Sequence, residues 1–314
     1  MTRHARESDS SPPPVREIRQ TLRTPADFRF WPTVRSHGWC TLPPFASNPD
    51  RRELRRLLLS PGGEVLLCRV RAVDGRLQIL TRGRHELSLP DRRKILEDLR
   101  ICLRMDEDFS AFHAALRSSK EYRWIATARA GRLLRSPTVF EDTIKMICTT
   151  NCSWTQTVSM VNNIVTAFGK RFDKDLCAFP AADALAASSE KFLRATCRTG
   201  YRAPYILELA ERVAAGKLDL EAWRTSPAAL PDLEREMRTV RGLGDYAVGN
   251  LLRLLGRYEH LALDSWVRSK YYELYTGGRR VSDAQIEKRY RGRWRGLLFW
   301  LDMTRHWHEE KFPP

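Results

Sequence analysis

The sequence predicts an α+β fold in which an N-terminal antiparallel β-sheet domain precedes an all-helical region. Before Pro90, short runs alternate apolar and polar residues and are separated by turn residues, which is the pattern of half-buried strands. After Pro90, apolar residues recur at helical steps and continue to do so. We therefore expect a disordered tail at residues 1–20, the sheet domain at 21–104 and the helical region at 105–314.

The clearest strand signal is EVLLCRVRAVDGRLQIL, residues 64–80. Asp74 and Gly75 suit a two-residue type I′ turn, and apolar residues alternate with polar ones on either side. The segment DFRFWPTVRSHGWCTLPPF, residues 27–45, adds aromatic and β-branched residues with proline breaks. We expect it to contribute further strands to the sheet. The tail is rich in Ser, Pro and charge, which bury too little surface to order a chain.

The helical region is expected to form two lobes, one from residues 136–250 and one from residues 105–135 together with 251–314. Apolar spacing and start signals such as Ser-Pro before Thr138 place the helices. They are expected near 92–104, 108–118, 138–149, 155–168, 180–187, 204–215, 228–238, 245–256, 265–275 and 294–304.

The charge balance points to a polyanionic partner. The 314 residues include 54 Lys and Arg against 38 Asp and Glu, a formal net charge of +16. A field of that sign favours nucleic acid, the commonest polyanion. A basic protein that meets anionic lipid is the alternative interpretation of the same numbers.

The seven cysteines argue against several metal and redox classes. No two form a CxxC pair and their number is odd, so neither a disulfide framework nor a zinc site is predicted. None follows Cys197, which leaves no thiolate cluster for an iron–sulfur centre near the C-terminus. No apolar run approaches ~20 residues, so no transmembrane helix is expected.

A glycine turn between two expected helices is the first candidate site. VRGLG, residues 240–244, separates the helices at 228–238 and 245–256. Glycines allow a ligand to approach the backbone closely, and the N–H groups at the start of the second helix are suited to bind phosphate. A plain helix–helix connection that uses glycine as a C-cap is the alternative.

Asp264 follows this turn and precedes another expected helix. Aspartate is among the preferred N-cap residues, so a structural role would explain it. A carboxylate near a phosphate-binding turn is also suited to stabilise positive charge that develops on a sugar and to orient water.

Three segments together resemble the helix–hairpin–helix (HhH-GPD) DNA glycosylase superfamily, nearest to its 8-oxoguanine and 3-methyladenine bacterial branch. Residues 242–244 resemble the hairpin, and Asp264 resembles the catalytic aspartate in spacing and context. Residues 140–169 resemble the family's helix–turn–helix, in which an asparagine fills the gap left by the extruded base, and Asn151 is the matching residue. Residues 200–210 resemble a third family stretch.

The resemblance implies a particular chemistry. Bifunctional members carry a lysine early in the helix after the hairpin, where this chain has Tyr246. Tyrosine cannot form a Schiff base, so the resemblance implies a monofunctional enzyme that uses water. Lys145 keeps a lyase alternative open, because it lies in a mostly apolar helix less than two turns before Asn151. If it points inward, a partner is expected, for which Asp264 is a candidate; a solvated lysine is the other interpretation.

The remaining candidates concern the base and the DNA. Trp154, Tyr246 and Trp266 are the expected base-pocket residues, with core packing as the alternative for the tryptophans. Tyr201 and Arg202 either line the DNA side or hold a helix start. The expected DNA-binding residues are Asn151, Tyr201, Arg202, Gly242, Leu243 and Gly244.

We therefore expect a DNA glycosylase that flips a damaged or modified base from double-stranded DNA and hydrolyses its N-glycosidic bond. A non-catalytic DNA-binding protein and a lyase acting through Lys145 are the alternatives. The base itself is left open among 8-oxoguanine, alkylated purines, deaminated bases and modified pyrimidines. We expect no cofactor, no metal-ligand cluster, a monovalent cation at the hairpin carbonyls of residues 240–244, a monomer, and a cytoplasmic, nucleoid-associated protein if bacterial or otherwise a nuclear one.

Overall fold

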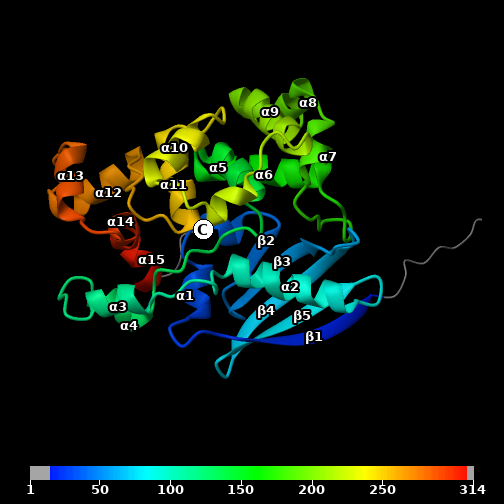
Figure 1. The fold of residues 1–314 in the computed structure, drawn as a ribbon, viewed down its shortest axis with the longest axis horizontal. Helices are drawn as coiled ribbons and strands as arrows, with labels where there is room; N and C mark the ends of the chain where they lie inside the picture. The colour runs from blue at the N-terminus through cyan, green and yellow to red at the C-terminus, as the bar shows by residue number, and fades with distance from the viewer. Residues whose placement is uncertain (1–14, 310–314) are drawn as a thin grey trace, which may run out of the picture.

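A five-stranded antiparallel sheet lies in the lower part of the molecule, with α1 and α2 against it and α3 and α4 to one side, and most of the other helices lie above it (Figure 1). The computed structural model describes residues 15–309. The α+β prediction is confirmed. The spatial order of the strands is β1 (Arg16–Arg23), β5 (Arg76–Gly83), β4 (Val65–Val73), β3 (Glu53–Leu59) and β2 (Phe45–Asn48).

The hairpin that joins β4 to β5 has the predicted turn. Val73 pairs with Arg76, which leaves Asp74 and Gly75 as the two loop residues. Their φ values are 48° and 72°, and a type I′ turn requires positive φ at both positions.

Two strand-region predictions are wrong. Residues 16–20 belong to β1 and are not part of a disordered tail; the tail's residues 1–14 lie outside the described residues. Backbone pairing with β5 orders this edge strand. Because most of its side chains are exposed, its sequence has no apolar alternation that would have predicted a strand. The segment 27–45 contains the helix α1 (Phe30–Val34) and the 3₁₀ helix η1 (Gly38–Thr41) before β2. Proline in a first helical turn loses no intrahelical bond, which makes Pro32 compatible with α1.

The ten expected helices are present, with boundaries shifted by a few residues. Besides α1, four short helices, α4, α8, α13 and α15, were not predicted, because five to seven residues give too few turns for a periodic pattern. The helices are α2 (Leu89–Cys102), α3 (Ser110–Leu116), α4 (Arg123–Ala128), α5 (Val139–Thr149), α6 (Trp154–Phe168), α7 (Ala182–Ala186), α8 (Glu190–Ala195), α9 (Ala203–Ala214), α10 (Leu230–Arg238), α11 (Asp245–Leu255), α12 (Ser265–Tyr275), α13 (Asp283–Arg289), α14 (Arg295–Met303) and α15 (Arg305–Glu309).

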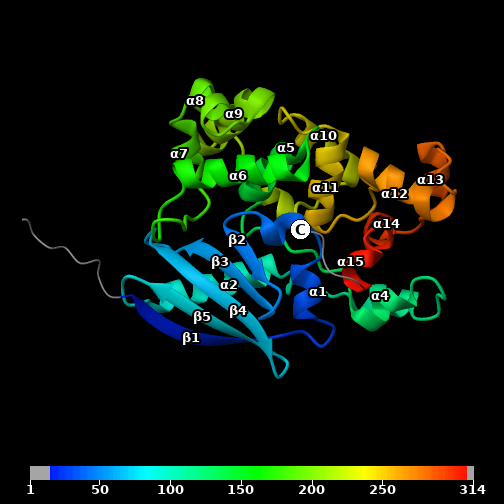
Figure 2. The same ribbon diagram turned by 180° about the vertical axis from the view of Figure 1, so that it is seen from behind.

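One hydrophobic core joins the sheet to the helices. It runs from Leu22 in β1 through α2, α5 and α11 to Leu301 in α14. Helix α2 crosses one face of the sheet, and α5 and α6 lie above the sheet (Figures 1 and 2). Helix α5 is buried along ten of its eleven residues, so it forms the centre of the helical half. This packing fixes α5, α11 and the residues around η1 relative to one another.

Candidate active site

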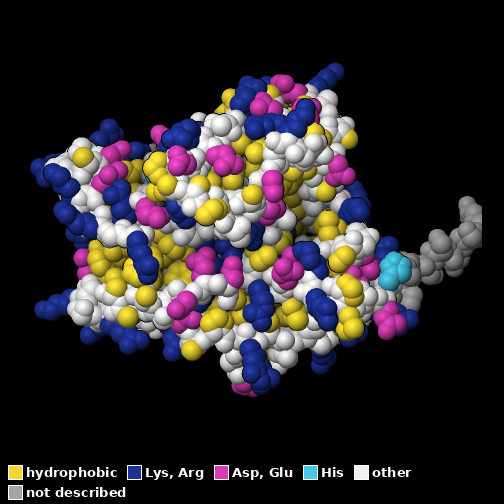
Figure 3. All heavy atoms as spheres, in the orientation of Figure 1, with side chains coloured by type: hydrophobic (Ala, Val, Ile, Leu, Met, Phe, Trp, Pro, Cys, Tyr) yellow, Lys and Arg dark blue, Asp and Glu magenta, His cyan; other side chains and the backbone are white. Residues whose placement is uncertain are grey.

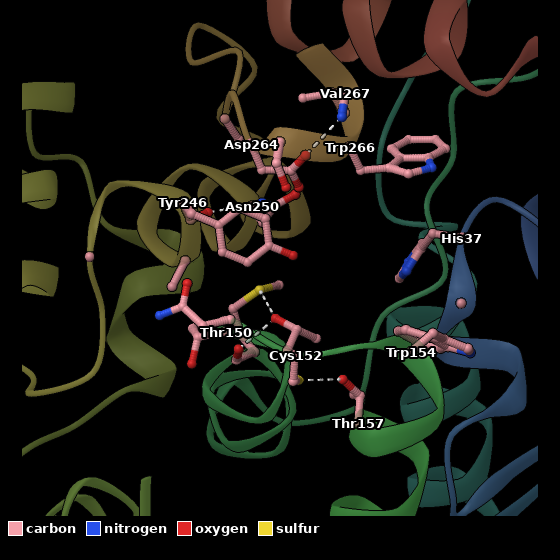
Figure 4. Close-up of a pocket in the computed structure, with 18 of the residues that line it drawn as sticks. His37, Thr150, Cys152, Trp154, Thr157, Tyr246, Asn250, Asp264, Trp266 and Val267 are labelled. Atoms are coloured by element: carbon pink, nitrogen blue, oxygen red, sulfur yellow. Dashed lines mark hydrogen bonds between the residues drawn. The ribbon is translucent and has the colours of Figure 1, made fainter. Parts of the chain in front are cut away.

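A pocket of about 1140 Å³ lies where the sheet half meets the helical half. Its walls come from η1 and the residue before it, from the turn between α5 and α6, and from α11, α12, α14 and α15. Figure 4 shows Tyr246 and Asp264 on one side of the open centre and His37 and Trp154 on the other. The pocket therefore brings together side chains that lie more than 200 residues apart in the sequence.

The glycine turn has the predicted helix–hairpin–helix form. Helix α10 ends at Arg238, and α11 begins at Asp245 with Gly244 as its N-cap. Gly242 has φ = 91°, and a Cβ placed on it would lie 2.9 Å from the ring of Tyr205. Gly244 has ordinary φ, and a Cβ placed on it would meet nothing within 4 Å, so its backbone faces open space. One glycine is needed for the turn, and the other leaves the N-terminus of α11 accessible.

The remaining hairpin residues are placed as follows. Leu243 is buried, and its N–H donates to the carbonyl of Val240 at 3.1 Å. A leucine anchored in this way holds the hairpin on the core. The cation expected at the carbonyls of residues 240–244 stays a prediction. Among the described residues, no group of three or more His, Cys, Asp or Glu side chains is arranged to hold a metal ion.

Asp264 is both an N-cap and a pocket residue. Its Oδ1 accepts a hydrogen bond from the Val267 N–H at 2.8 Å, which caps α12. Its carboxylate also lines the pocket (Figure 4). Burial raises the pKa of Asp264, while hydrogen bonds from the backbone of Val267 and Trp266 and the charge of Arg253 lower it. The capping and catalytic interpretations of this residue are therefore compatible.

Tyr246 lies in the first turn of α11 and lines the pocket beside Asp264 (Figure 4). Burial raises the pKa of its phenol, and the negative charge of Asp264 adds to that effect, while a hydrogen bond with Thr149 opposes it. The phenol is therefore neutral near pH 7 and presents a flat, partly buried ring. The predicted role of this ring against an extruded base stays a prediction.

The alternative in which Lys145 faces the pocket, with Asp264 as its candidate partner, is wrong. Lys145 is fully buried and does not line the pocket. Its Nζ lies 2.6 Å from Glu141 Oε1, one turn earlier in α5, and Glu141 also pairs with Arg56 of β3. The ammonium sits 5.0 Å from the ring of Phe45. A solvated lysine, the other interpretation, is equally wrong, because the sheet covers this face of α5.

Trp266, Trp300 and Trp307 form one wall of the pocket, the tryptophan wall, and Trp154 lies apart from them. Trp266 is 42% exposed and stacks on Trp307 at 5.6 Å between ring centroids, so core packing is not its role. Trp300 lies 6.2 Å from Trp266. Trp154 lies against Gly38, where an added Cβ would overlap the indole. Trp300 and Trp307 were not among the predicted pocket residues; three tryptophans between residues 294 and 307 are the signal that could have indicated them.

Arg253 supplies a buried positive charge beside this wall. Its guanidinium donates to Asn250 Oδ1 at 2.9 Å and to the carbonyl of Leu261 at 2.7 Å, and it lies 5.0 Å from the ring of Trp300. Burial lowers its pKa to about 10, so it stays charged near pH 7. Arg253 was not among the predicted site residues, although an arginine in the apolar run LLRLL is a signal of a buried, paired charge.

The turn between α5 and α6 carries Asn151 at the edge of the pocket. Asn151 has φ = 47° and is exposed, and its Nδ2 donates to the hydroxyl of Tyr201 at 3.2 Å. Arg202 is buried, donates to the carbonyl of Thr150, and lies 4.5 Å from the ring of Tyr201. This arrangement favours a bracing role for Arg202 and leaves Asn151 and Tyr201 accessible.

The described part of the chain has no helix that is both long and apolar enough to cross a membrane. On the face that Figure 3 shows, Lys and Arg side chains of the described residues are spread widely and intermixed with Asp and Glu.

Fold and pocket together define an α+β protein of the helix–hairpin–helix kind, and comparison with solved structures agrees. The chain is similar to a 3-methyladenine DNA glycosylase from Archaeoglobus fulgidus, with a TM-score of 0.72, 18% identity, and 91% of this chain and 97% of that one covered. It is also similar to the 8-oxoguanine glycosylase/lyase of Clostridium acetobutylicum bound to double-stranded DNA, with a TM-score of 0.70, 18% identity, and 94% and 98% covered.

A third similar structure is MBOgg1 in complex with a DNA ligand, with a TM-score of 0.69, 20% identity, and 92% and 96% covered. No family model matches the sequence, and no curated protein matches it. The resemblance to HhH-GPD glycosylases is thus confirmed for the fold, over nearly the whole chain.

Proposed function

We propose that this protein is a monofunctional DNA glycosylase, which extrudes a damaged or modified base from double-stranded DNA and hydrolyses its N-glycosidic bond. One observation carries the proposal. The described residues that line the pocket include a partly buried carboxylate, Asp264, next to the hairpin, and no lysine. A pocket with a carboxylate and no amine favours attack by water over attack by a Schiff-base nucleophile.

Asp264 acts at the sugar in this proposal. As the base departs, positive charge develops on the deoxyribose, and a carboxylate in a partly buried site stabilises that charge more strongly than it would in water. The same group orients the attacking water. Because the N-cap bond to Val267 fixes the side chain, the carboxylate is held in place before the reaction.

The surrounding residues bind and hold the DNA. The open backbone at Gly244 and the N-terminus of α11 bind a phosphate, independent of sequence. Asn151, supported by Tyr201, enters the gap that the extruded base leaves. The base enters the pocket beside the ring of Tyr246 and the tryptophan wall, where aromatic faces stack on it.

The structures with this fold support the proposal by their chemistry. Two are described as 8-oxoguanine glycosylase/lyase and 3-methyladenine DNA glycosylase, and two were solved with DNA. We further propose that the protein acts as a monomer, since one chain supplies every wall of the pocket described above.

The test is an excision assay on duplexes that carry 8-oxoguanine, an alkylated purine, hypoxanthine, uracil or an abasic site. Strand breaks that appear only after alkali, and that disappear in Asp264→Asn, are the expected result. Breaks without alkali, together with a protein–DNA adduct trapped by borohydride, would contradict a monofunctional enzyme. Binding without base release from any duplex would instead indicate the non-catalytic alternative.

A further inference from the structure

His37 occupies a place in the pocket wall that the proposed chemistry does not use. It precedes Gly38 and η1, is only 7% exposed, and lines the pocket. In Figure 4 it faces Tyr246 across the open centre and lies between Trp154 and Trp266. A base that stacks beside Tyr246 therefore presents its rim to His37.

The hydrogen bonding of His37 fixes its tautomer. Nε2 lies 2.5 Å from the carbonyl oxygen of Leu134, and a carbonyl can only accept, so Nε2 carries the proton. Burial lowers the pKa of the imidazole to about 3, and the charges of Arg253, Lys145 and Arg104 add to this effect, so the ring is neutral near pH 7. Nδ1 is then an acceptor, and it has no hydrogen-bond partner among the described residues.

An unpartnered acceptor in a nine-tenths buried side chain selects its ligand by hydrogen bonding. A base with an N–H at this position pairs with Nδ1, whereas a base with a lone pair or an alkyl group there leaves Nδ1 unpaired or clashes with it. Such discrimination is stronger than the discrimination that an apolar wall achieves. The atom therefore suits bases in the lactam form, which carry a ring N–H beside a carbonyl.

The buried charge of Arg253 also favours a neutral lactam base, for an independent reason. It stands in the pocket wall beside Trp300 and is fixed by its bonds to Asn250 and Leu261. In the proposed function Asp264 faces the sugar, which leaves Arg253 as a buried positive charge in the wall that the base approaches. A neutral lactam base enters this field at lower cost than a cationic N-alkylpurine does.

Resting on the proposed function, we propose that His37 determines base specificity by accepting a hydrogen bond from a ring N–H of the extruded base. The pocket thereby selects neutral lactam bases, oxidised or deaminated, over bases that are alkylated or bare at that nitrogen. His37 is a specificity residue in this account, and Asp264 remains the catalytic one.

Matched duplexes test this inference. In each pair one member carries a ring N–H that the other lacks: 8-oxoguanine with 7-methyl-8-oxoguanine, hypoxanthine with 1-methylhypoxanthine, and uracil with 3-methyluracil. A 2′-fluoroarabino sugar at the lesion prevents hydrolysis, so affinity is measured without turnover. In at least one pair, we expect the wild-type protein to bind the N–H member about tenfold or more tightly than its partner.

Two variants separate the acceptor atom Nδ1 from the hydrogen bond that Nε2 donates to the carbonyl of Leu134. His37→Asn keeps an amide oxygen near the position of Nδ1 and should retain the preference. His37→Gln keeps a donor for Leu134 but no acceptor at Nδ1, and the preference should shrink to about threefold or less. His37→Phe, which keeps a ring and removes both nitrogens, repeats the test if the Gln variant unfolds.

Equal affinity of the wild-type protein for both members of all three pairs would overturn the inference, as would an unchanged preference in both His37→Gln and His37→Phe. Failure of the proposed function looks different. In that case the natural-sugar duplexes release no base, while the binding preference and its dependence on His37 persist.

Discussion

At the scale of single residues, Asp264 shows how one carboxylate serves the fold and the proposed chemistry together. It caps α12 through the Val267 N–H and lines the pocket with the same side chain. Substitutions can separate these roles, because asparagine is as good an N-cap as aspartate but carries no charge.

We predict that Asp264→Asn lowers single-turnover base excision about a hundredfold or more, because the charge that stabilises the sugar cation is lost. DNA binding should change by no more than about threefold. Asp264→Ala should lose activity equally and should also lose about 1 kcal/mol of stability, because the cap is removed. Base release by the Asn variant at the wild-type rate would show that Asp264 is only a cap.

The raised pKa of Asp264 gives a pH dependence with a definite sign. A carboxylate whose pKa is raised in the folded state is less well stabilised there than in the unfolded chain. Its ionised form therefore lowers the free energy of unfolding at neutral pH, and this cost disappears as the pH falls through its pKa. Asp264→Asn should therefore have a Tm equal to or above that of the wild type at pH 7. This difference should shrink at acid pH, where the wild-type group is protonated.

In the wild-type protein the excision rate should fall at acid pH, where the stability cost of Asp264 disappears. Excision needs the ionised carboxylate, so the rate should fall on the acid side at a higher pH than for an aspartate with an unshifted pKa. Rate measurements between pH 3.5 and 8 on one duplex would show this limb. An acid limb that persists in residual Asp264→Asn activity would assign it to another group.

At the scale of elements, the hairpin between α10 and α11 depends on two glycines for different reasons. Gly242 has positive φ and lies against Tyr205, whereas Gly244 has ordinary φ and open surroundings. Sequence alone could place the hairpin between two helices. It could not distinguish the two glycines, because the contact with Tyr205 comes from α9, more than thirty residues away.

Gly242→Ala should cost about 1–3 kcal/mol of stability, since an L-residue is strained at this φ and its Cβ meets the Tyr205 ring. Gly244→Ala is the matched control and should leave the unfolding midpoint nearly unchanged. If a phosphate approaches Gly244 closely, its added methyl group should still weaken DNA binding. Equal stabilities for the two variants would contradict this assignment.

Helix α5 illustrates a buried ion-pair cluster that joins the two halves of the molecule. Glu141 bonds to Arg56 of β3 through both carboxylate oxygens and to Lys145 of its own helix. These charges hold the pKa of Glu141 at about 2, although burial alone would raise it. A buried carboxylate with two cationic partners is costly to remove from one side only.

We predict that Lys145→Met leaves excision within about threefold of the wild type, because Lys145 lies outside the pocket and Arg56 still pairs with Glu141. Glu141→Ala should instead destabilise the protein by about 3–5 kcal/mol, since it leaves two buried cations unpaired. Thermal unfolding and the excision assay together check both outcomes. Loss of activity in a stable Lys145→Met variant would restore the lysine to the mechanism.

At the scale of the whole molecule, the limits of sequence reasoning follow from the range of the interactions. Local patterns predicted the β4–β5 hairpin and the long helices, since turn chemistry and periodicity act within a few residues. The sequence could not show that β3 and Phe45 cover Lys145, nor that His37 faces Tyr246. These juxtapositions depend on how the sheet packs on the helices. The start of edge strand β1 was not predicted for the same reason, because its order comes from pairing with β5.

The net charge of +16 leads to the last prediction, which concerns the whole molecule's encounter with DNA. Phosphate contacts release counterions, so affinity should fall steeply with salt, by about a thousandfold between 50 and 200 mM if some six phosphates are contacted. Those contacts read no base, whereas the pocket makes its contacts after the base has been extruded. The slope of log affinity against log salt should therefore be the same for lesion-containing and undamaged duplexes, and their affinity ratio should not depend on salt. A ratio that collapses at high salt would mean that charge, and not the pocket, discriminates the lesion.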